Sequence, residues 1–280
     1  LNYPEQARMV ADKCGEAVQW TIDSLGVEYT DVLVQFGGHS KARSYATKEG
    51  SGYGIIKKQL DKVKELEIDM SLERKVSKLF TNEQGRVVGV EYENTSSGKT
   101  KTIKANKAVV IAAGGFGQDV KFRLTQDPRL SDDFDCTNHS GATAEVLQAS
   151  LEIGMLPVQL DRIQLGPWAS PDEKGFGHVP QFSVPAASPW GIIVDPETGK
   201  RFVNELANRR VKSDAIIRVG HPVINFCDSD GWNKVPPGMN LQPALDSGAI
   251  FKAESLEKIA SHYDIPQQAL KKTVQKYNSY

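Results

Sequence analysis

The sequence has few cysteines, no long hydrophobic run and no long run of one charge. Its three cysteines, Cys14, Cys136 and Cys227, are an odd number at wide spacings, so they indicate neither a disulfide framework nor a metal site. No apolar stretch approaches the roughly 20 residues that span a bilayer, and we expect no membrane span. The formal net charge is −1, which argues against nucleic acid or an anionic membrane as the main partner.

The composition is that of an ordinary globular protein. Of 280 residues, 25% are charged and 39% hydrophobic, which is enough to bury the core of one large domain or two ordinary ones. Leu1 is not methionine, no signal peptide is visible, and Tyr280 falls inside a helical pattern. We therefore expect a piece of a longer chain. Its compartment stays open between the bacterial cytoplasm and the periplasm or cell surface.

Periodic apolar residues predict helices and strands in the first half of the chain. We expect helices over 4–25, 53–66 and 142–153. Short segments between turn residues predict five strands, over 67–70, 75–80, 86–93, 100–104 and 108–113. The middle strands form a small β-meander inserted before the last one.

The most informative segment is the last of these strands with the glycines that follow it. Residues 108–113 are all apolar, which predicts a strand buried on both faces. The strand stops at Gly114 and Gly115, where the missing side chains let a ligand approach the backbone. Ligands of α/β sheets bind at the carboxyl ends of strands, so this pair indicates a site for a large flat molecule.

The sequence becomes loose and rich in proline and glycine between 154 and 189. We place a domain boundary there, giving domains 1–160 and 161–280. Beyond it the patterns predict three strands and three helices. The strands are expected over 191–195, 200–204 and 222–228, and the helices over 210–218, 254–262 and 266–280.

Several motifs occur in a fixed order along the chain. They are Gly37-Gly38-His39-Ser40 with Arg43, Ala112-Ala113-Gly114-Gly115-Phe116-Gly117, Thr137-Asn138-His139-Ser140-Gly141, Ile163-Gln164, and Gly199-Lys200-Arg201-Phe202-Val203-Asn204-Glu205 with Arg209. The ordered set resembles the flavoprotein family of fumarate reductases, succinate dehydrogenases and flavocytochrome c enzymes, which includes urocanate reductase. The resemblance covers nearly the whole chain.

The resemblance implies an α/β fold: part of a Rossmann-like FAD-binding domain with the inserted meander, followed by a capping domain of α+β type. The family's glycine-rich phosphate loop would precede residue 1, and its last FAD and substrate segment would follow residue 280. The cofactor implied is FAD. The residues that match the family's cofactor positions are Val76, Ala113, Gly114, Gly115, Asn138 and Glu145. Around Glu145 the family's trailing glycine is replaced by Val146.

The resemblance also implies a catalytic arginine. Arg209 stands eight residues after Arg201 and matches the family arginine that protonates the substrate. Because arginine is ordinarily never deprotonated, it can act as an acid only toward a strongly basic, carbanion-like carbon. The adjacent Arg210 is the alternative if the register differs by one residue.

The chain departs from the fumarate reductases at two places that concern the substrate. Gly166 stands where they have a carboxylate-binding histidine, and 184–188 lacks their ionisable residues. The pocket is then roomier and more apolar, with Trp168, Phe182 and Trp190 as candidate lining residues. The proton relay would also differ, and its candidates are Asp172, Glu173 and Glu205.

We therefore predict an FAD-dependent reductase of an α,β-unsaturated carboxylate, an aryl- or heteroaryl-acrylate in preference to fumarate. Its partners would be this small molecule and an electron donor that carries FMN or haem. Two alternatives stay open. One is an oxidase or dehydrogenase of the same superfamily, of the L-aspartate oxidase or ketosteroid dehydrogenase type. The other is a non-catalytic fragment.

Overall fold

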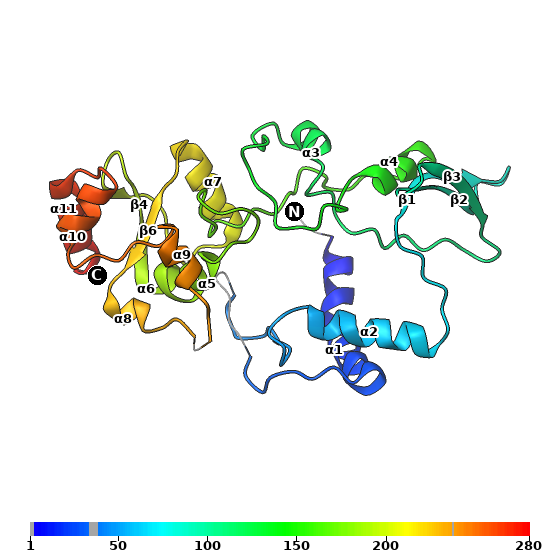
Figure 1. Cartoon of the computed structure of the whole chain (residues 1–280), viewed down its shortest axis with the longest axis horizontal. Helices are drawn as coiled ribbons and strands as arrows, with labels where there is room; N and C mark the ends of the chain where they lie inside the picture. Colours follow the sequence, from blue (N-terminus) through cyan, green and yellow to red (C-terminus); the bar gives the residue numbers. More distant parts are fainter. Residues whose placement is uncertain (1–2, 34–38, 237) are drawn as a thin grey trace. The chain divides into compact units, whose positions relative to one another are not determined.

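The computed structural model describes residues 3–33, 39–236 and 238–280. The chain divides into two compact units, Leu1–Leu72 and Glu73–Tyr280, each of which is described by itself (Figure 1). The boundary expected at residue 160 separates functional domains and stays a prediction. In the described part of the chain, no helix is long and apolar enough to cross a membrane.

The described residues of the first unit form two helices, as predicted. Helix α1 (Pro4–Leu25) begins with a proline in its first turn and ends at Gly26, whose φ of 69° lies in the left-handed region. Helix α2 spans Tyr53–Glu65. Gly37 and Gly38 of the first motif lie outside the described residues.

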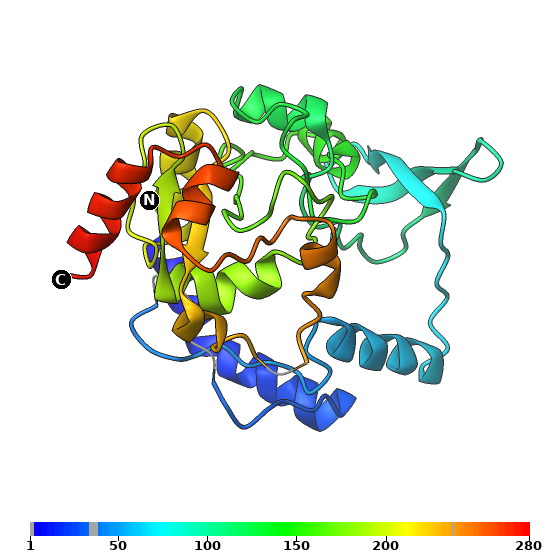
Figure 2. The same cartoon turned by 60° about the vertical axis from the view of Figure 1, so that its left-hand side comes forward.

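The second unit begins with the predicted meander. Strands β1 (Arg74–Thr81), β2 (Val87–Asn94) and β3 (Lys99–Lys104) form an antiparallel sheet in that order. Helix α4 (Glu145–Glu152) packs on β1, as Figure 2 also shows. All of β3 is exposed, so one edge of this sheet carries none of the core.

Two predicted strands are wrong. Residues 67–70 and 108–113 form no strand, and 110–115 are exposed, with Val110 at 87%. A strand buried on both faces needs neighbours on its edges to bond its N–H and C=O groups. Among the strands that the structure describes, none pairs with 108–113. The apolar composition of 108–113 predicted a strand, and the described structure offers it no neighbouring strand to pair with.

A second antiparallel sheet holds the larger core. Its order is β5 (Lys200–Arg201), β4 (Gly191–Asp195) and β6 (Ile224–Cys227). Helices α10 (Leu256–His262) and α11 (Gln267–Tyr277) pack against it (Figure 1). Their shared core consists of Ile192, Val194, Ala260, Ile265 and Leu270. Gly191 is required there, because a Cβ would lie 2.0 Å from the carbonyl oxygen of Phe226.

The remaining helices of this unit are short except α7. They are α3 (Val120–Gln126), α5 (Pro180–Phe182), the π-helical turn η1 (Ser183–Ala187), α6 (Ser188–Trp190), α7 (Arg209–Val219), α8 (Ser229–Trp232) and α9 (Gln242–Asp246). A smaller core consists of Leu241, Ala244 of α9 and Ile250, with Phe182 and Trp232 packed against it.

Candidate active site

The first turn of α7 carries the arginine expected to act on the substrate. Asn208 caps the helix, since its side chain accepts a hydrogen bond of 3.0 Å from the backbone N–H of Val211. The helix therefore begins at Arg209. Successive residues of a helix point about 100° apart, so Arg209 and Arg210 leave the same turn in different directions.

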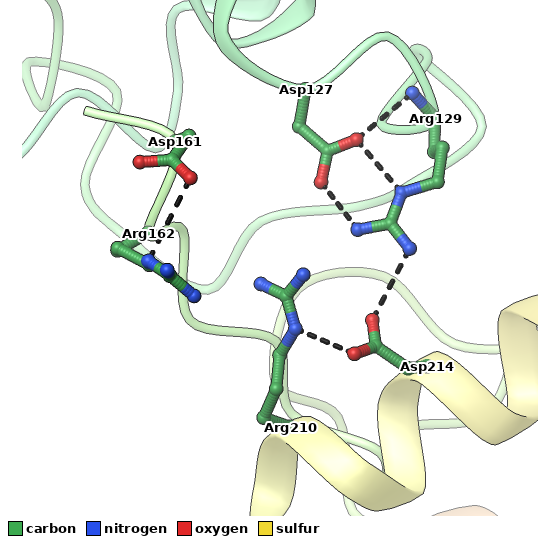
Figure 3. A network of polar contacts seen from close by, with 6 residues as sticks. All are labelled: Asp127, Arg129, Asp161, Arg162, Arg210 and Asp214. Carbon is green, nitrogen blue, oxygen red and sulfur yellow. Dashed lines mark hydrogen bonds and ion pairs between the residues drawn. The ribbon is translucent and has the colours of Figure 1, made fainter. Parts of the chain in front are cut away.

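Arg210 is neutralised by a carboxylate. Its Nε donates to Oδ2 of Asp214 at 2.6 Å, and the other oxygen of Asp214 accepts from Arg129 at 3.2 Å (Figure 3). Arg129 also pairs with Asp127 at 2.7 Å. Although burial acts to raise it, hydrogen bonds from Arg210 and Arg129 lower the pKa of Asp214. This network links the segment after α3 to α7. Figure 3 also shows a separate ion pair, that of Asp161 and Arg162.

Arg209 has a different partner. Its guanidinium carbon lies 4.9 Å from the centre of the Trp168 ring. Nζ of Lys212 lies 4.7 Å from the same ring centre. Both are distances at which a cation is attracted by the π electrons of an aromatic ring. Among the described residues, neither cation has a carboxylate within ion-pair distance.

The sequence reasoning missed Lys212. This side chain is only 3% exposed. Burial, and then the charge of Arg209, lower the pKa of Lys212, while Glu205 acts in the opposite direction. The available signal was its spacing: residues three apart on a helix share a face, so Lys212 lies one turn beyond Arg209. A lysine this buried, with a lowered pKa and beside the expected catalytic group, belongs to the candidate site.

Trp168 is held in place from its own backbone. Ser183, at the start of η1, donates its hydroxyl to the carbonyl oxygen of Trp168 at 2.9 Å. Gly166 is beside the ring, since a Cβ there would lie 3.8 Å from Trp168 Cε3. The structure thus brings together three predicted residues: Gly166, Trp168 and Arg209.

The other two candidate lining residues have other contacts. Trp190 is half exposed, with Nζ of Lys234 4.6 Å from its ring centre. Phe182 packs against Trp232, with ring centres 5.4 Å apart. Their roles in a substrate pocket stay predictions.

The three candidate relay carboxylates are engaged elsewhere. Asp172 accepts from the hydroxyl of Ser170 at 3.1 Å. Glu173 accepts from the backbone N–H groups of His178 and Val179, each at 2.9 Å. Glu205 is the most buried of the three. It accepts from the N–H of Ile193 at 2.8 Å and from Arg201 at 2.7 Å.

Two of the candidate cofactor residues, Val76 and Glu145, lie on elements of this unit that pack together, β1 and α4. Glu145, at the start of α4, pairs with Lys75 at 2.5 Å, which is next to Val76 on β1. Burial works to raise the pKa of Glu145, but Lys75 and Thr143 lower it by hydrogen bonding. Because its carboxylate is paired with Lys75, Glu145 has a structural role that the sequence did not indicate.

The glycine motif is joined to the Asn138 segment by hydrogen bonds. The side-chain amide of Gln118 donates to the carbonyl oxygen of Asn138 at 2.7 Å, and its backbone N–H donates to Ala142 at 3.0 Å. Gly117 lies against the same segment, since a Cβ there would be 2.7 Å from Nδ2 of Asn138 and would require that side chain to shift.

Ala113, Gly114 and Gly115 are exposed, and their role in binding a flat ligand stays a prediction. Gly114 has a φ of 75°, which explains the glycine there. Gly115 has no such φ, and a Cβ on it would meet nothing within 4 Å, so neither conformation nor packing requires a glycine. Close approach of a ligand to the backbone would require one. In the described parts of the chain, no group of acidic, histidine or cysteine residues is placed to bind a metal ion.

Comparison with known proteins assigns this chain to a family. A family model described as the FAD binding domain matches residues 1–280. The acrylate reductase flavoprotein subunit of Shewanella woodyi is 38% identical over 98% of this chain and 55% of its own length. The urocanate reductase of Eggerthella lenta is 29% identical over 99% of this chain and 46% of its length.

A solved structure has the same fold. The open conformation of a flavocytochrome c3 fumarate reductase matches with a TM-score of 0.68 and 27% identity. The match covers 96% of this chain and 46% of that one. The chain therefore spans about half the length of the relatives that it matches.

Proposed function

The chain belongs to the FAD binding domain family, and from this premise we propose that the protein reduces the C=C bond of an α,β-unsaturated carboxylate. The observation that carries the proposal is the contrast at the start of α7. Arg210 pairs with Asp214, whereas the exposed Arg209 lies over Trp168 with no carboxylate of the described residues within ion-pair distance. The names of the acrylate and urocanate reductases support the same reaction.

The cofactor of the family is FAD, and the exposed backbone of Ala113, Gly114 and Gly115 would receive it, together with Asn138. Val76 and Glu145 would border it from β1 and α4. Bound FAD supplies a hydride for the β-carbon of the unsaturated acid. Protein residues must then bind the acid, orient its double bond, and bring a proton to the neighbouring carbon.

Arg209 is the proton donor in this proposal. Addition of hydride to the β-carbon leaves the electron pair of the double bond on the α-carbon, and that carbon takes a proton from the guanidinium. A guanidinium releases a proton only to a very strong base, and a carbanion-like α-carbon is one. The ring of Trp168 orients the guanidinium without neutralising it, whereas a carboxylate would make it a weaker acid.

We assign the substrate class from the surroundings of Trp168. Gly166 brings no side chain to the space beside the indole ring, and residues 184–188 bring no charge for a second carboxylate. A monocarboxylate with an aryl or heteroaryl group therefore suits this region better than fumarate. Electrons would come from a domain or protein that bears haem or FMN, and the flavocytochrome among the structural matches supports this.

The test uses the protein in its full natural length. The purified protein is expected to show a flavin absorption spectrum. It is also expected to oxidise reduced methyl viologen without oxygen when cinnamate, urocanate or acrylate is added, and more slowly with fumarate. Turnover of L-aspartate with oxygen, or of a 3-ketosteroid, with no enoate reduced would contradict the proposal and favour the oxidising alternatives.

A further inference from the structure

One face of α7 carries two buried hydrogen-bond donors, Lys212 and Ser213, for which the described residues supply no acceptor, next to the exposed Arg209. Arg209, Lys212 and Ser213 lie at positions i, i+3 and i+4, which share a face of a helix. Lys212 and Ser213 are 3% and 4% exposed. In the part of the chain that the structure describes, the hydroxyl of Ser213 has no hydrogen-bond partner. Lys212 has no ion pair there either.

The neighbouring carboxylate cannot supply the missing acceptor. Glu205 is within electrostatic range of Lys212, but its two oxygens already accept from Arg201 and from the N–H of Ile193. Trp168 offers its ring to both cations, and a ring neutralises no charge. Buried donors without acceptors, and buried charges without partners, are costly and rare in native proteins. An anion that brings its own oxygens would satisfy both Lys212 and Ser213.

We propose that Lys212 and Ser213 bind the carboxylate of the unsaturated acid, and that they form a carboxylate site one helical turn from Arg209. This inference rests on the proposed function, and it assigns to that site the group that holds the substrate. A carboxylate supplies two oxygens with about four acceptor positions, which match an ammonium and a hydroxyl.

The proposed reaction requires the carboxylate site to lie next to Arg209. The α-carbon is bonded directly to the carboxylate carbon. The residue that protonates the α-carbon and the residue that binds the carboxylate must therefore be side by side. Side chains three apart on a helix have Cβ atoms about 5–6 Å apart, which is the scale of this fragment. By binding the carboxylate, Lys212 would place the α-carbon of the acid next to the guanidinium of Arg209.

The experiment compares acids with their amides. Acrylate, cinnamate and urocanate, and the matching primary amides, are titrated into the full-length oxidised protein, and the Kd values are measured by calorimetry. The amides keep the shape and lose the charge. Wild-type protein is expected to prefer the acid. Because a buried charge pair is lost, Lys212→Met is expected to raise the Kd of the acid about 30-fold or more. The Kd of the amide should change little, and Lys212→Arg should restore most of the preference.

Lys252 serves as a matched control, because it too is a lysine placed over a tryptophan ring. Its Nζ lies 3.5 Å from the ring centre of Trp232, and the residue is exposed. Lys252→Met should leave both Kd values unchanged. Ser213→Ala keeps the lysine and is expected to weaken acid binding about fivefold, the loss of one hydrogen bond. It provides the test if Lys212→Met does not fold, as judged by circular dichroism.

The outcomes separate this inference from the proposed function. If an enoate is reduced but neither Lys212→Met nor Ser213→Ala lowers the preference for acid over amide, the carboxylate site is refuted and the reductase stands. If no enoate is reduced but acid binding depends on Lys212, the carboxylate site stands and the reductase is refuted. If acids and amides bind alike and nothing is reduced, both are refuted.

Discussion

The two faces of α7 hold cations in opposite ways. On one face Arg210 meets Asp214, which also accepts from Arg129 (Figure 3). On the other, Arg209 and Lys212 lie over the ring of Trp168, and no carboxylate of the described residues is within ion-pair distance of either. A cation in an ion pair helps to hold the helix in place, whereas a cation without a carboxylate partner can bind a charged ligand. The contrast supports the proposal that Arg209, and not Arg210, acts on the substrate.

The largest effect should separate these arginines. Arg209→Gln is expected to lower kcat about 1,000-fold, the usual range for loss of a general acid, with the flavin spectrum unchanged. Arg210→Gln should leave kcat within about threefold, because its charge is already paired. Steady-state rates of enoate reduction measure both. If Arg210→Gln loses turnover while Arg209→Gln keeps it, the assignment is off by one residue.

The ion pair of Glu205 with Arg201 should contribute strongly to the free energy of unfolding. Glu205→Ala removes the partner of Arg201 and of the Ile193 N–H, and it is expected to cost about 3 kcal/mol of unfolding free energy. Glu205→Gln keeps an acceptor for the N–H and should cost less. Denaturant unfolding gives both values. Equal stability of Glu205→Ala and the wild type would mean that this carboxylate is free for another role.

The lowered pKa of Lys212 should change how the free energy of unfolding depends on pH. Its pKa is lowered in the folded protein, by burial first and then by Arg209, so the unfolded chain binds this proton more tightly. Between the folded and unfolded pKa values, the wild type should therefore gain stability as pH rises, by at most about 1.4 kcal/mol per pH unit.

Lys212→Met is the reference for this measurement, because it lacks only this titrating group. The difference in unfolding free energy between wild type and variant should shift in favour of the wild type toward alkaline pH. A difference that stays constant from neutral to alkaline pH would show that Lys212 titrates normally.

The smallest effect should come from the paired face. Asp214→Asn leaves Arg210 and Arg129 without their shared carboxylate, and both arginines are partly exposed. The expected loss is about 1 kcal/mol or less. A thermal unfolding series in rising salt checks it, since the wild type should approach the variant as screening increases. A loss of several kcal/mol would mean that this network is buried in solution.

Much of the fold could be predicted from local patterns. The helix at α1, the meander β1–β3 and strand β4 follow from periodicity and turn residues, which act over a few positions. The segment 108–113 could not be predicted in this way. Its composition favours a strand, but a strand exists only when another backbone lies beside it. Local preference therefore established the elements, and pairing decided which of them became part of a sheet.

The candidate site divides in the same manner. Sequence alone determined the family resemblance, the glycines at 114–115 and the choice of Arg209, because motifs preserve residue types at fixed spacings. The tertiary structure decided that Trp168 lies against Arg209 and that Glu205 pairs with Arg201. It also decided that Lys212 is buried with no carboxylate of the described residues within ion-pair distance. The physical reason is that burial and charge compensation depend on partners distant in the chain, which no local pattern encodes.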